Sequence, residues 1–213
     1  MYTNEAPRTA DRSLPRKSLV MVVHPEEIAA LPEPALPEGY RIRLYESGDA
    51  EHWARLMTDV REFETQNAGL ESFNRQFMPE EAELRRRLGF IVAPDGAPVA
   101  TSMAWWFEEG GRRYGRLHWV CVHPDHQNFG LGRAVVAWGM RRTAALEPGL
   151  DVYLDTQTWS HKAIGLYLRL GFHPVRESHP VLHDMNEYGE TLEILRGVLP
   201  PQTLRLFLER SVD

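Results

Sequence analysis

The chain has 213 residues, of which 43% are hydrophobic and 25% are charged, a composition typical of a folded globular protein. Its formal net charge of −6 argues against a broad basic surface for nucleic acid, and no apolar run is long enough to span a membrane. The single cysteine, Cys121, excludes an intramolecular disulfide framework and fits a reducing compartment, so we expect a cytoplasmic protein.

The N-terminal part of the chain is polar and rich in proline. The first eighteen residues carry four basic side chains and lack the apolar segment of a signal peptide, so residues 1–18 are expected to form a disordered arm. A short strand is predicted at 18–23. The segment 25–37 then holds four prolines, too many for an uninterrupted helix or a central strand.

The next elements are read from hydrophobic spacing. An alternating strand is predicted at 40–45 and an amphipathic helix from Gly48 to about Val60, followed by a second helix over 79–88. Three strands separated by Gly- and Asp-containing turns come next, at 90–93, 99–107 and 114–123. Alternation places Trp105 and Trp106 on opposite faces of their strand.

From Gly130 the spacing changes to that of a helix of about fourteen residues. Shorter elements follow: a strand at 151–155, a helix at 162–170, a strand at 172–176, and helical segments at 188–198 and 203–210. This order predicts an α+β fold with a mixed, mostly antiparallel sheet flanked by helices. We expect a single domain over 19–180 and a helical C-terminal extension over 181–213 packed on the same domain.

The most informative segment runs from Val120 to Gly132, through a predicted buried strand and a glycine loop into a helix. Gly130 and Gly132 allow the backbone to approach a ligand, and the free N–H groups of a helix's first turn attract an anion. The loop matches neither a Walker A sequence nor a dinucleotide fingerprint. It suggests a diphosphate site; the alternative is a helix start at which glycine only provides the turn.

Two motifs together resemble those of the GCN5-related N-acetyltransferases. Gln127-x-x-Gly130-x-Gly132 resembles the acetyl-CoA loop of that family, and Ala163-x-x-x-Tyr167-x-x-x-Gly171-Phe172 resembles its second signature. The motifs agree in order, separation and predicted secondary structure, and the resemblance covers residues 40–175. It implies an α+β sheet that splays at the acetyl-CoA site, and acetyl-CoA as co-substrate; we expect no metal.

The resemblance also implies which residues bind the cofactor. The backbone of 120–122 would accompany the pantetheine arm as if it were an added strand, and residues 127–133 would hold the diphosphate. Ser160 stands where the family often has an asparagine, and offers one hydrogen-bond donor instead of two. The cofactor-binding residues expected are therefore Val120, Cys121, Val122, Gln127, Asn128, Phe129, Gly130, Leu131, Gly132, Arg133 and Ser160.

Three residues are candidates for proton transfer. Tyr167 matches the tyrosine that in this family often protonates the departing coenzyme A thiolate. A lysine-like amine has a pKa of about 10.4, so a base must accept its proton. Asp155 aligns with the glutamate base of ribosomal-protein N-acetyltransferases, and His118 lies on the same strand as Val122. The alternative for Asp155 is an aspartate that only caps the end of its strand, and the alternative for His118 is a histidine that only packs in the core.

Arg116 stands where histone acetyltransferases have a glutamate, which counts against histone-type chemistry.

We therefore expect an N-acetyltransferase that moves the acetyl group of acetyl-CoA to an amine by direct attack in a ternary complex. The alternative is a non-catalytic acyl-CoA-binding or regulatory module on the same fold. The acceptor would be a small molecule or peptide bearing an amine, and pairing of edge strands would allow a homodimer. Cys121 is expected to pack rather than to act as a nucleophile, and His123 and His126 lack a third metal ligand nearby in sequence.

Overall fold

The computed structural model describes residues 10–177 and 181–213 of the chain. Within these residues seven strands form one sheet in the order β2-β3-β4-β5-β6-β1-β7. The pairings β1–β6, β1–β7, β2–β3 and β3–β4 are antiparallel, and β5–β6 is parallel. The strands are β1 (Ser18–Val23), β2 (Arg41–Leu44), β3 (Leu88–Val92), β4 (Pro98–Glu109), β5 (Arg112–Val122), β6 (Val152–Gln157) and β7 (His173–Pro174). This sheet confirms the α+β fold with mixed, mostly antiparallel strands.

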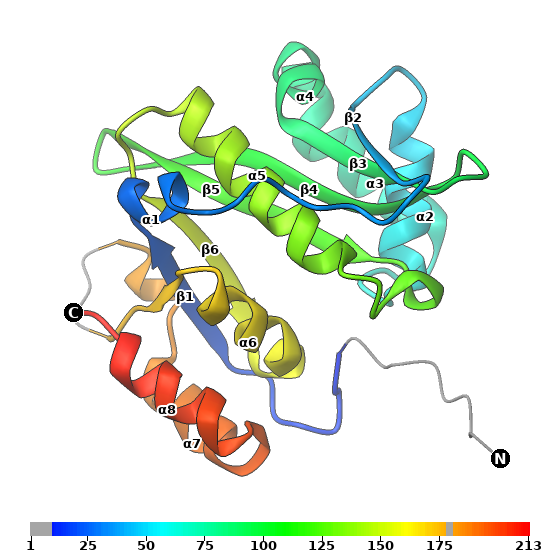
Figure 1. The fold of residues 1–213 in the computed structure, drawn as a ribbon. Coiled ribbons are helices and arrows are strands. Elements are labelled where there is room, and N and C mark those ends of the chain that lie inside the picture. Colours follow the sequence, from blue (N-terminus) through cyan, green and yellow to red (C-terminus); the bar gives the residue numbers. More distant parts are fainter. Residues whose placement is uncertain (1–9, 178–180) are drawn as a thin grey trace, which may run out of the picture. The chain divides into compact units, whose positions relative to one another are not determined.

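Eight α-helices accompany the strands in the described part of the chain (Figure 1). They are α1 (Pro25–Ala29), α2 (Asp49–Asp59), α3 (Gln66–Phe77), α4 (Glu81–Arg87), α5 (Leu131–Leu146), α6 (His161–Arg169), α7 (Tyr188–Val198) and α8 (Pro201–Arg210). None of these helices combines the length and apolarity needed to cross a membrane. The described residues divide into two compact units: the first unit holds 33–104 and 119–142, and the second unit holds 10–32, 105–118 and 143–213.

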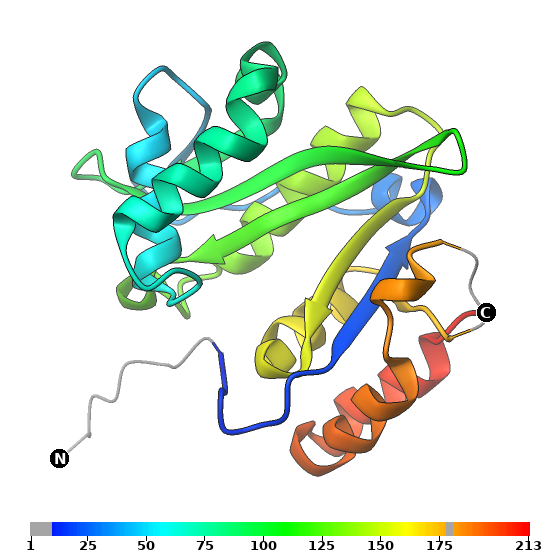
Figure 2. The ribbon, with the colours of Figure 1, turned by 180° about the vertical axis from the view of Figure 1, so that it is seen from behind.

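In the first unit, helices cover both faces of the strands. Figures 1 and 2 show α3 and α5 on opposite sides of β3 and the adjoining part of β4. On the α5 side, the indole of Trp138 lies so close to Gly89 that an added Cβ would collide with the ring. On the α3 side, the Trp53 ring centroid lies 5.1 Å from that of Phe73 and 5.1 Å from that of Trp119. The fully buried Trp53 therefore anchors an aromatic core.

In the second unit, the N-terminal strand β1 lies between two strands from the C-terminal half of the chain. Val20 pairs with Asp155 of β6, and Met21 pairs with Pro174 of β7. Residues 19–23 are at most 1% exposed, so this strand is a core element. Helix α8 packs against α6 and β7, and α7 packs against β1. The sequence predicted this strand but not its neighbours.

Other elements differ from the sequence-based expectation. Helix α3 was not predicted, and β7 is two residues long instead of five. The arm expected over 1–18 lies outside the described residues at 1–9. Beyond them the segment is held to the second unit: the Asp11 N–H donates to Trp159 O at 2.8 Å, and the Trp159 indole N–H donates to Leu14 O at 2.7 Å.

Candidate functional site

The glycine loop of the first unit connects β5 to α5 and is fixed at both ends. The N–H of His123 donates to the carbonyl of Val99 at 2.7 Å, which continues the sheet into the loop. A single 3-10 turn over Pro124–His126 follows, and the side-chain amide of Gln127 donates to Val122 O at 3.2 Å. Gln127 therefore closes the loop back onto the strand that leads into it.

The loop then adopts left-handed backbone conformations that expose its N–H groups. Asn128 has φ +68° and Gly130 has φ +81°. The Ala134 N–H donates to Gly130 O at 3.1 Å and closes the first turn of α5. In the described part of the chain, the N–H groups of residues 128–133 have no protein acceptor. Since free N–H groups at a helix N-terminus bind anions, the loop can hold a diphosphate. The Phe129 side chain beside them is 56% exposed.

Two side-chain contacts that the sequence did not indicate support this loop. The Tyr40 hydroxyl lies 3.0 Å from His126 Nδ1, and His123 Nε2 lies 3.5 Å from a carboxylate oxygen of Asp59. Each loop histidine is thus engaged by a residue from far earlier in the chain. Spacing alone had only indicated that these histidines lack a third metal ligand.

Cys121 lies in β5 just before the loop, within the first unit. Burial raises the pKa of its thiol well above the usual range, and the negative charge of Glu62 acts in the same direction. The thiol is therefore protonated at neutral pH and a poor nucleophile. A poor nucleophile at this position is consistent with a packing role for Cys121. Trp119, two residues earlier, has φ +47°, so β5 departs from regular strand geometry at that point.

The second unit holds the expected proton-transfer residues. Strands β5 and β6 pair in parallel at Gly115↔Val152 and Arg116↔Tyr153. This pairing brings the Arg116 guanidinium onto Asp155, where Nε donates to Oδ1 at 3.0 Å and a second N–H reaches the same oxygen. Oδ2 of Asp155 has no hydrogen-bond partner among the described residues. A carboxylate held this way is oriented by one oxygen and can accept a proton on the other.

His118 belongs to the same group of charges. Dense packing around the imidazole lowers the pKa of His118 to about 3; the positive charge of Arg116 lowers it further and the negative charge of Asp155 opposes the shift. The imidazole is therefore neutral at physiological pH and holds an accepted proton weakly. Burial therefore weakens His118 as a base, whereas Asp155 keeps one carboxylate oxygen without a hydrogen bond among the described residues.

Tyr167 and Ser160 lie on and beside α6. Tyr167 is 8% exposed, and its ring packs edge-on against Phe172 with centroids 5.7 Å apart. Ser160 precedes the helix and accepts a hydrogen bond from Gln157 Nε2 at 3.3 Å. The structure thus places the three proton-transfer candidates and Ser160 in the second unit, and residues 120–133 in the first unit.

The two adjacent tryptophans contradict the prediction from alternation. The rings of Trp105 and Trp106 stack with centroids 4.4 Å apart and planes 20° apart, so both lie on one side. The guanidinium of Arg113 lies 4.2 Å from the Trp106 ring centroid. The regular alternation of side chains is lost at this point of β4, because two rings on opposite faces of a strand cannot stack.

Comparison with known proteins shows what this chain resembles. The acetyltransferase (GNAT) family matches residues 53–172. Mycothiol acetyltransferase from Actinosynnema mirum is 32% identical over 149 residues, covering 68% of this chain and 49% of the relative. The protein of the same name from Saccharomonospora viridis is 31% identical over 194 residues, covering 80% of this chain and 58% of the relative. The chain therefore spans about half the length of these relatives.

Solved structures share the fold at lower identity. A tandem GNAT protein from the clavulanic acid biosynthesis pathway superposes with a TM-score of 0.57 and 20% identity, covering 78% of this chain and 52% of that chain. A GCN5-related N-acetyltransferase from Sphaerobacter thermophilus gives 0.54 and 22%, covering 75% and 48%. At these identities the likeness extends to the fold, which is the one predicted from the sequence.

Proposed function

Because the chain belongs to the acetyltransferase (GNAT) family, we propose that it transfers the acetyl group of acetyl-CoA directly to an amine. The observation that carries the proposal is the loop at 127–132: among the described residues, the N–H groups of 128–132 have no acceptor, and they lie at the start of α5. A diphosphate bound there would interact with backbone donors that no other described residue uses. The side chain of Arg133 would add a positive charge.

The proposed reaction has two parts: the amine attacks the thioester, and the coenzyme A thiolate leaves. The neutral amine attacks the thioester carbonyl carbon, the C–S bond breaks, and the amine nitrogen loses a proton as the thiolate leaves. Asp155, oriented by Arg116, would accept a proton from the amine through Oδ2, directly or through water. Tyr167 would donate a proton to the sulfur of coenzyme A. The protonated thiol of Cys121 supports direct transfer without an acetyl-enzyme.

The relatives suggest where to begin the search for the acceptor. They are named mycothiol acetyltransferases, so the amine form of mycothiol is the first acceptor to test, followed by polyamines, aminoglycosides and peptide N-termini. The family assignment supports acetyl-CoA as the acetyl donor, whereas acceptor preference in a fold of this kind is set by more variable surfaces.

The experiment separates cofactor binding from catalysis. Calorimetry with acetyl-CoA tests the loop, and absence of binding at millimolar ligand would contradict the proposal. Release of coenzyme A against the amine panel tests transfer. Tyr167→Phe is expected to lower kcat by about 100-fold with little change in acetyl-CoA affinity, since only the proton donor is removed.

The same experiment also tests the alternative, a non-catalytic acyl-CoA-binding module. Ser160 replaces the usual asparagine, and Asp155 is already engaged by Arg116. If acetyl-CoA binds but no amine in the panel releases coenzyme A, the chain is a non-catalytic acyl-CoA-binding module. Competition among acetyl-, propionyl- and succinyl-CoA then identifies the acyl group it prefers.

A further inference from the structure

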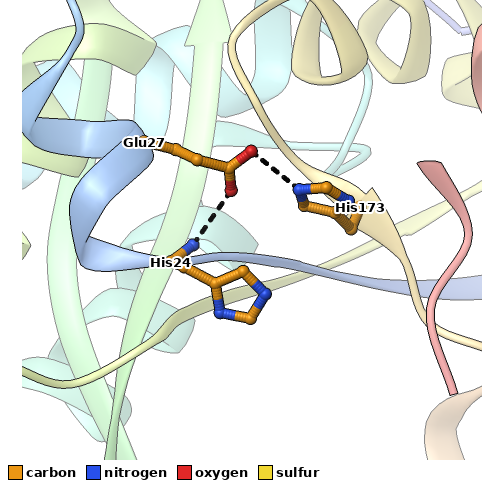
Figure 3. A group of neighbouring side chains, drawn as sticks. All are labelled: His24, Glu27 and His173. Carbon is orange, nitrogen blue, oxygen red and sulfur yellow. Dashed lines mark hydrogen bonds and ion pairs between the residues drawn. The ribbon is translucent and has the colours of Figure 1, made fainter.

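Three potential metal ligands meet in the second unit, among residues that acetyl transfer does not use. His24 follows β1, Glu27 lies in α1, and His173 lies in β7 (Figure 3). Their candidate donor atoms all lie within 4.8 Å of one another. The side chains of His24, Glu27 and His173 are 37%, 27% and 18% exposed, so an ion from solvent can reach them.

The two ring nitrogens of His173 both face acceptors. Nδ1 lies 2.9 Å from the carbonyl oxygen of Arg210, which can only accept, so Nδ1 carries a proton. In a neutral ring Nε2 then has a lone pair. Yet Nε2 lies 2.8 Å from the carboxylate oxygen Oε1 of Glu27, which also has only lone pairs to offer. A positive species between Nε2 and Oε1, either a second proton or a metal ion, resolves this conflict.

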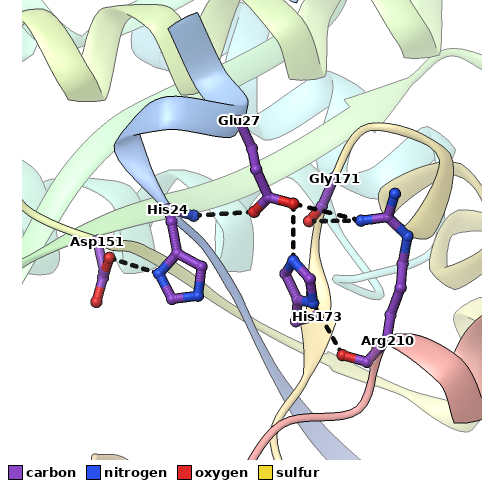
Figure 4. Close-up of polar contacts among 6 residues, drawn as sticks. All are labelled: His24, Glu27, Asp151, Gly171, His173 and Arg210. Atoms are coloured by element: carbon purple, nitrogen blue, oxygen red, sulfur yellow. Dashed lines mark hydrogen bonds and ion pairs between the residues drawn. The ribbon is translucent and has the colours of Figure 1, made fainter. Parts of the chain in front are cut away.

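His24 repeats half of this arrangement. Its Nδ1 lies 2.8 Å from the carboxylate of Asp151, so Nδ1 is the protonated nitrogen and Nε2 carries the lone pair (Figure 4). In the part of the chain that the structure describes, His24 Nε2 has no hydrogen-bond partner. The two imidazole centroids are 5.6 Å apart. Metal-binding histidines have this form: one nitrogen donates to a carboxylate or carbonyl, which fixes the tautomer and leaves the other to coordinate.

We propose that His24 Nε2, His173 Nε2 and the Glu27 carboxylate bind one divalent first-row transition-metal ion of the zinc class. Two imidazoles and one carboxylate suit such an ion, with water in the fourth position. An ion about 2.0 Å from His173 Nε2 and from Glu27 Oε1 requires these two atoms to separate from 2.8 Å to about 3.3 Å. The donor atoms of the three residues start within 4.8 Å of one another, so His24 has to reach a similar distance from the other two.

The charges around the site set its strength. Arg210 Nη1 lies 3.4 Å from Glu27 Oε1 and 3.2 Å from the carbonyl of Gly171, so one positive charge already interacts with the ligand carboxylate (Figure 4). Asp151 contributes a compensating negative charge through His24. Because Arg210 competes with the ion for Glu27, affinity should be lower than in a closed structural zinc site.

The position of the site predicts a consequence for folding. Strand β7 is only two residues long and pairs with β1 at Met21↔Pro174 and Val22↔His173. An ion held by ligands from both ends of this contact would link the N-terminal strand to the C-terminal part of the sheet. Since it binds the folded state alone, it should raise Tm with increasing ion concentration.

The test uses the full chain without a histidine tag. Protein stripped with EDTA is titrated with Co²⁺, whose visible absorption reports tetrahedral coordination, and Zn²⁺ is then added to displace it. One ion per chain and a rise in Tm are expected. His24→Ala and Glu27→Gln should each weaken binding by at least about 10-fold. In the parent protein the backbone N–H of His24 donates to Glu27 Oε2 at 3.3 Å. Glu27→Gln keeps a side-chain acceptor for this N–H, so the local fold is retained.

Two further variants make the result specific. Asp151→Asn keeps a side-chain acceptor for His24 Nδ1 and should weaken binding by about 10-fold, as expected for a positioning residue. His52→Ala, on α2 in the first unit, should leave binding unchanged. The proposal is overturned if neither ion binds at neutral pH and millimolar concentration, or if binding is unaltered in both His24→Ala and Glu27→Gln. The contact between His173 Nε2 and Glu27 Oε1 would then be a hydrogen bond and not part of a metal site.

Discussion

At the scale of single residues, Cys121 shows how burial decides chemistry. A cysteine in the strand that leads into the proposed cofactor loop suggests an acyl-transfer role, because thiolates attack thioesters readily. Burial and Glu62 raise the pKa of this thiol, so very little thiolate exists at neutral pH. The residue contributes volume to the first unit, and its protonated thiol fits the proposed direct transfer of the acetyl group.

This assignment predicts slow chemistry at Cys121. In the native protein at neutral pH, alkylation by iodoacetamide should be at least about 100-fold slower than in the urea-unfolded chain, since each pKa unit removes tenfold of the thiolate. Intact mass after incubation with acetyl-CoA alone should show no added acetyl group. Fast native alkylation, or a stable acetyl adduct that Cys121→Ala abolishes, would contradict it.

His118 leads to a prediction about acid stability. Its pKa is about 3 in the folded protein, against about 6.5 in an unfolded chain. Below pH 6.5 the unfolded state therefore binds a proton that the folded state does not, and stability is lost as pH falls from 6.5 towards 3. Above pH 6.5 both states are neutral and His118 contributes no pH dependence. The loss amounts to at most about 1.4 kcal/mol per pH unit.

Urea unfolding at a series of pH values tests this dependence. Between about pH 6.5 and pH 5 the free energy of unfolding of the parent should fall more steeply than that of His118→Gln, because glutamine does not titrate. Parallel pH profiles would show that the imidazole is protonated as readily in the fold as in the unfolded chain. His118 would then regain its place as a candidate base.

At the scale of elements, a comparison of Gly130 with Gly96 distinguishes the effect of backbone strain from the effect on cofactor binding. Gly130 and Gly96 both have positive φ, at +81° and +91°, and an added Cβ at either would meet nothing within 4 Å. Alanine should therefore cost each position about 1 kcal/mol through backbone conformation alone. Only Gly130 lies in the loop proposed to hold the diphosphate.

Alanine substitution of Gly130 and of Gly96 should have similar effects on stability and different effects on acetyl-CoA binding. Gly130→Ala and Gly96→Ala should lose similar free energies of unfolding by urea titration, but only Gly130→Ala should raise the Kd for acetyl-CoA, by about 10-fold or more. Gly96, in the turn between β3 and β4, is the control for general destabilisation. Equal cofactor affinity in the two variants would remove the loop from the diphosphate site.

The elements also show what could be predicted from sequence. Helices such as α2 and α5 were predicted because their hydrophobic spacing is local. Helix α3 was missed because two of its buried positions are Gly69 and Ser72, which give no apolar signal. The loop was found from its glycines, whereas the Arg116–Asp155 pair depends on strand register between residues 39 apart in sequence.

At the scale of the whole chain, the N-terminal strand is the feature that local patterns do not reveal. A strand at 18–23 was predicted, but its position between β6 and β7 depends on pairings with residues more than 120 positions later. Further bonds hold it there: Ser18 N–H donates to Glu187 Oε2 at 2.8 Å, and Glu187 N–H donates to Ser18 O at 2.9 Å. These bonds stabilise the fold because a backbone N–H without a partner in a buried strand costs free energy.

Asn186 links this strand to the C-terminal segment and carries the last prediction. Its Oδ1 accepts from Val20 N–H at 3.1 Å, and its Nδ2 donates to Val175 O at 2.8 Å. Asn186→Ala leaves both backbone groups without a partner and should lower the free energy of unfolding by about 1–3 kcal/mol. Asn67→Ala is the control: within the described part of the chain the Asn67 side chain bonds the exposed Glu71 on its own helix, so stability should change by less than about 0.5 kcal/mol. Equal losses in urea unfolding would mean that the Asn186 bonds add no stability, and that β1 is held by its packing, its strand pairing and the Ser18–Glu187 bonds.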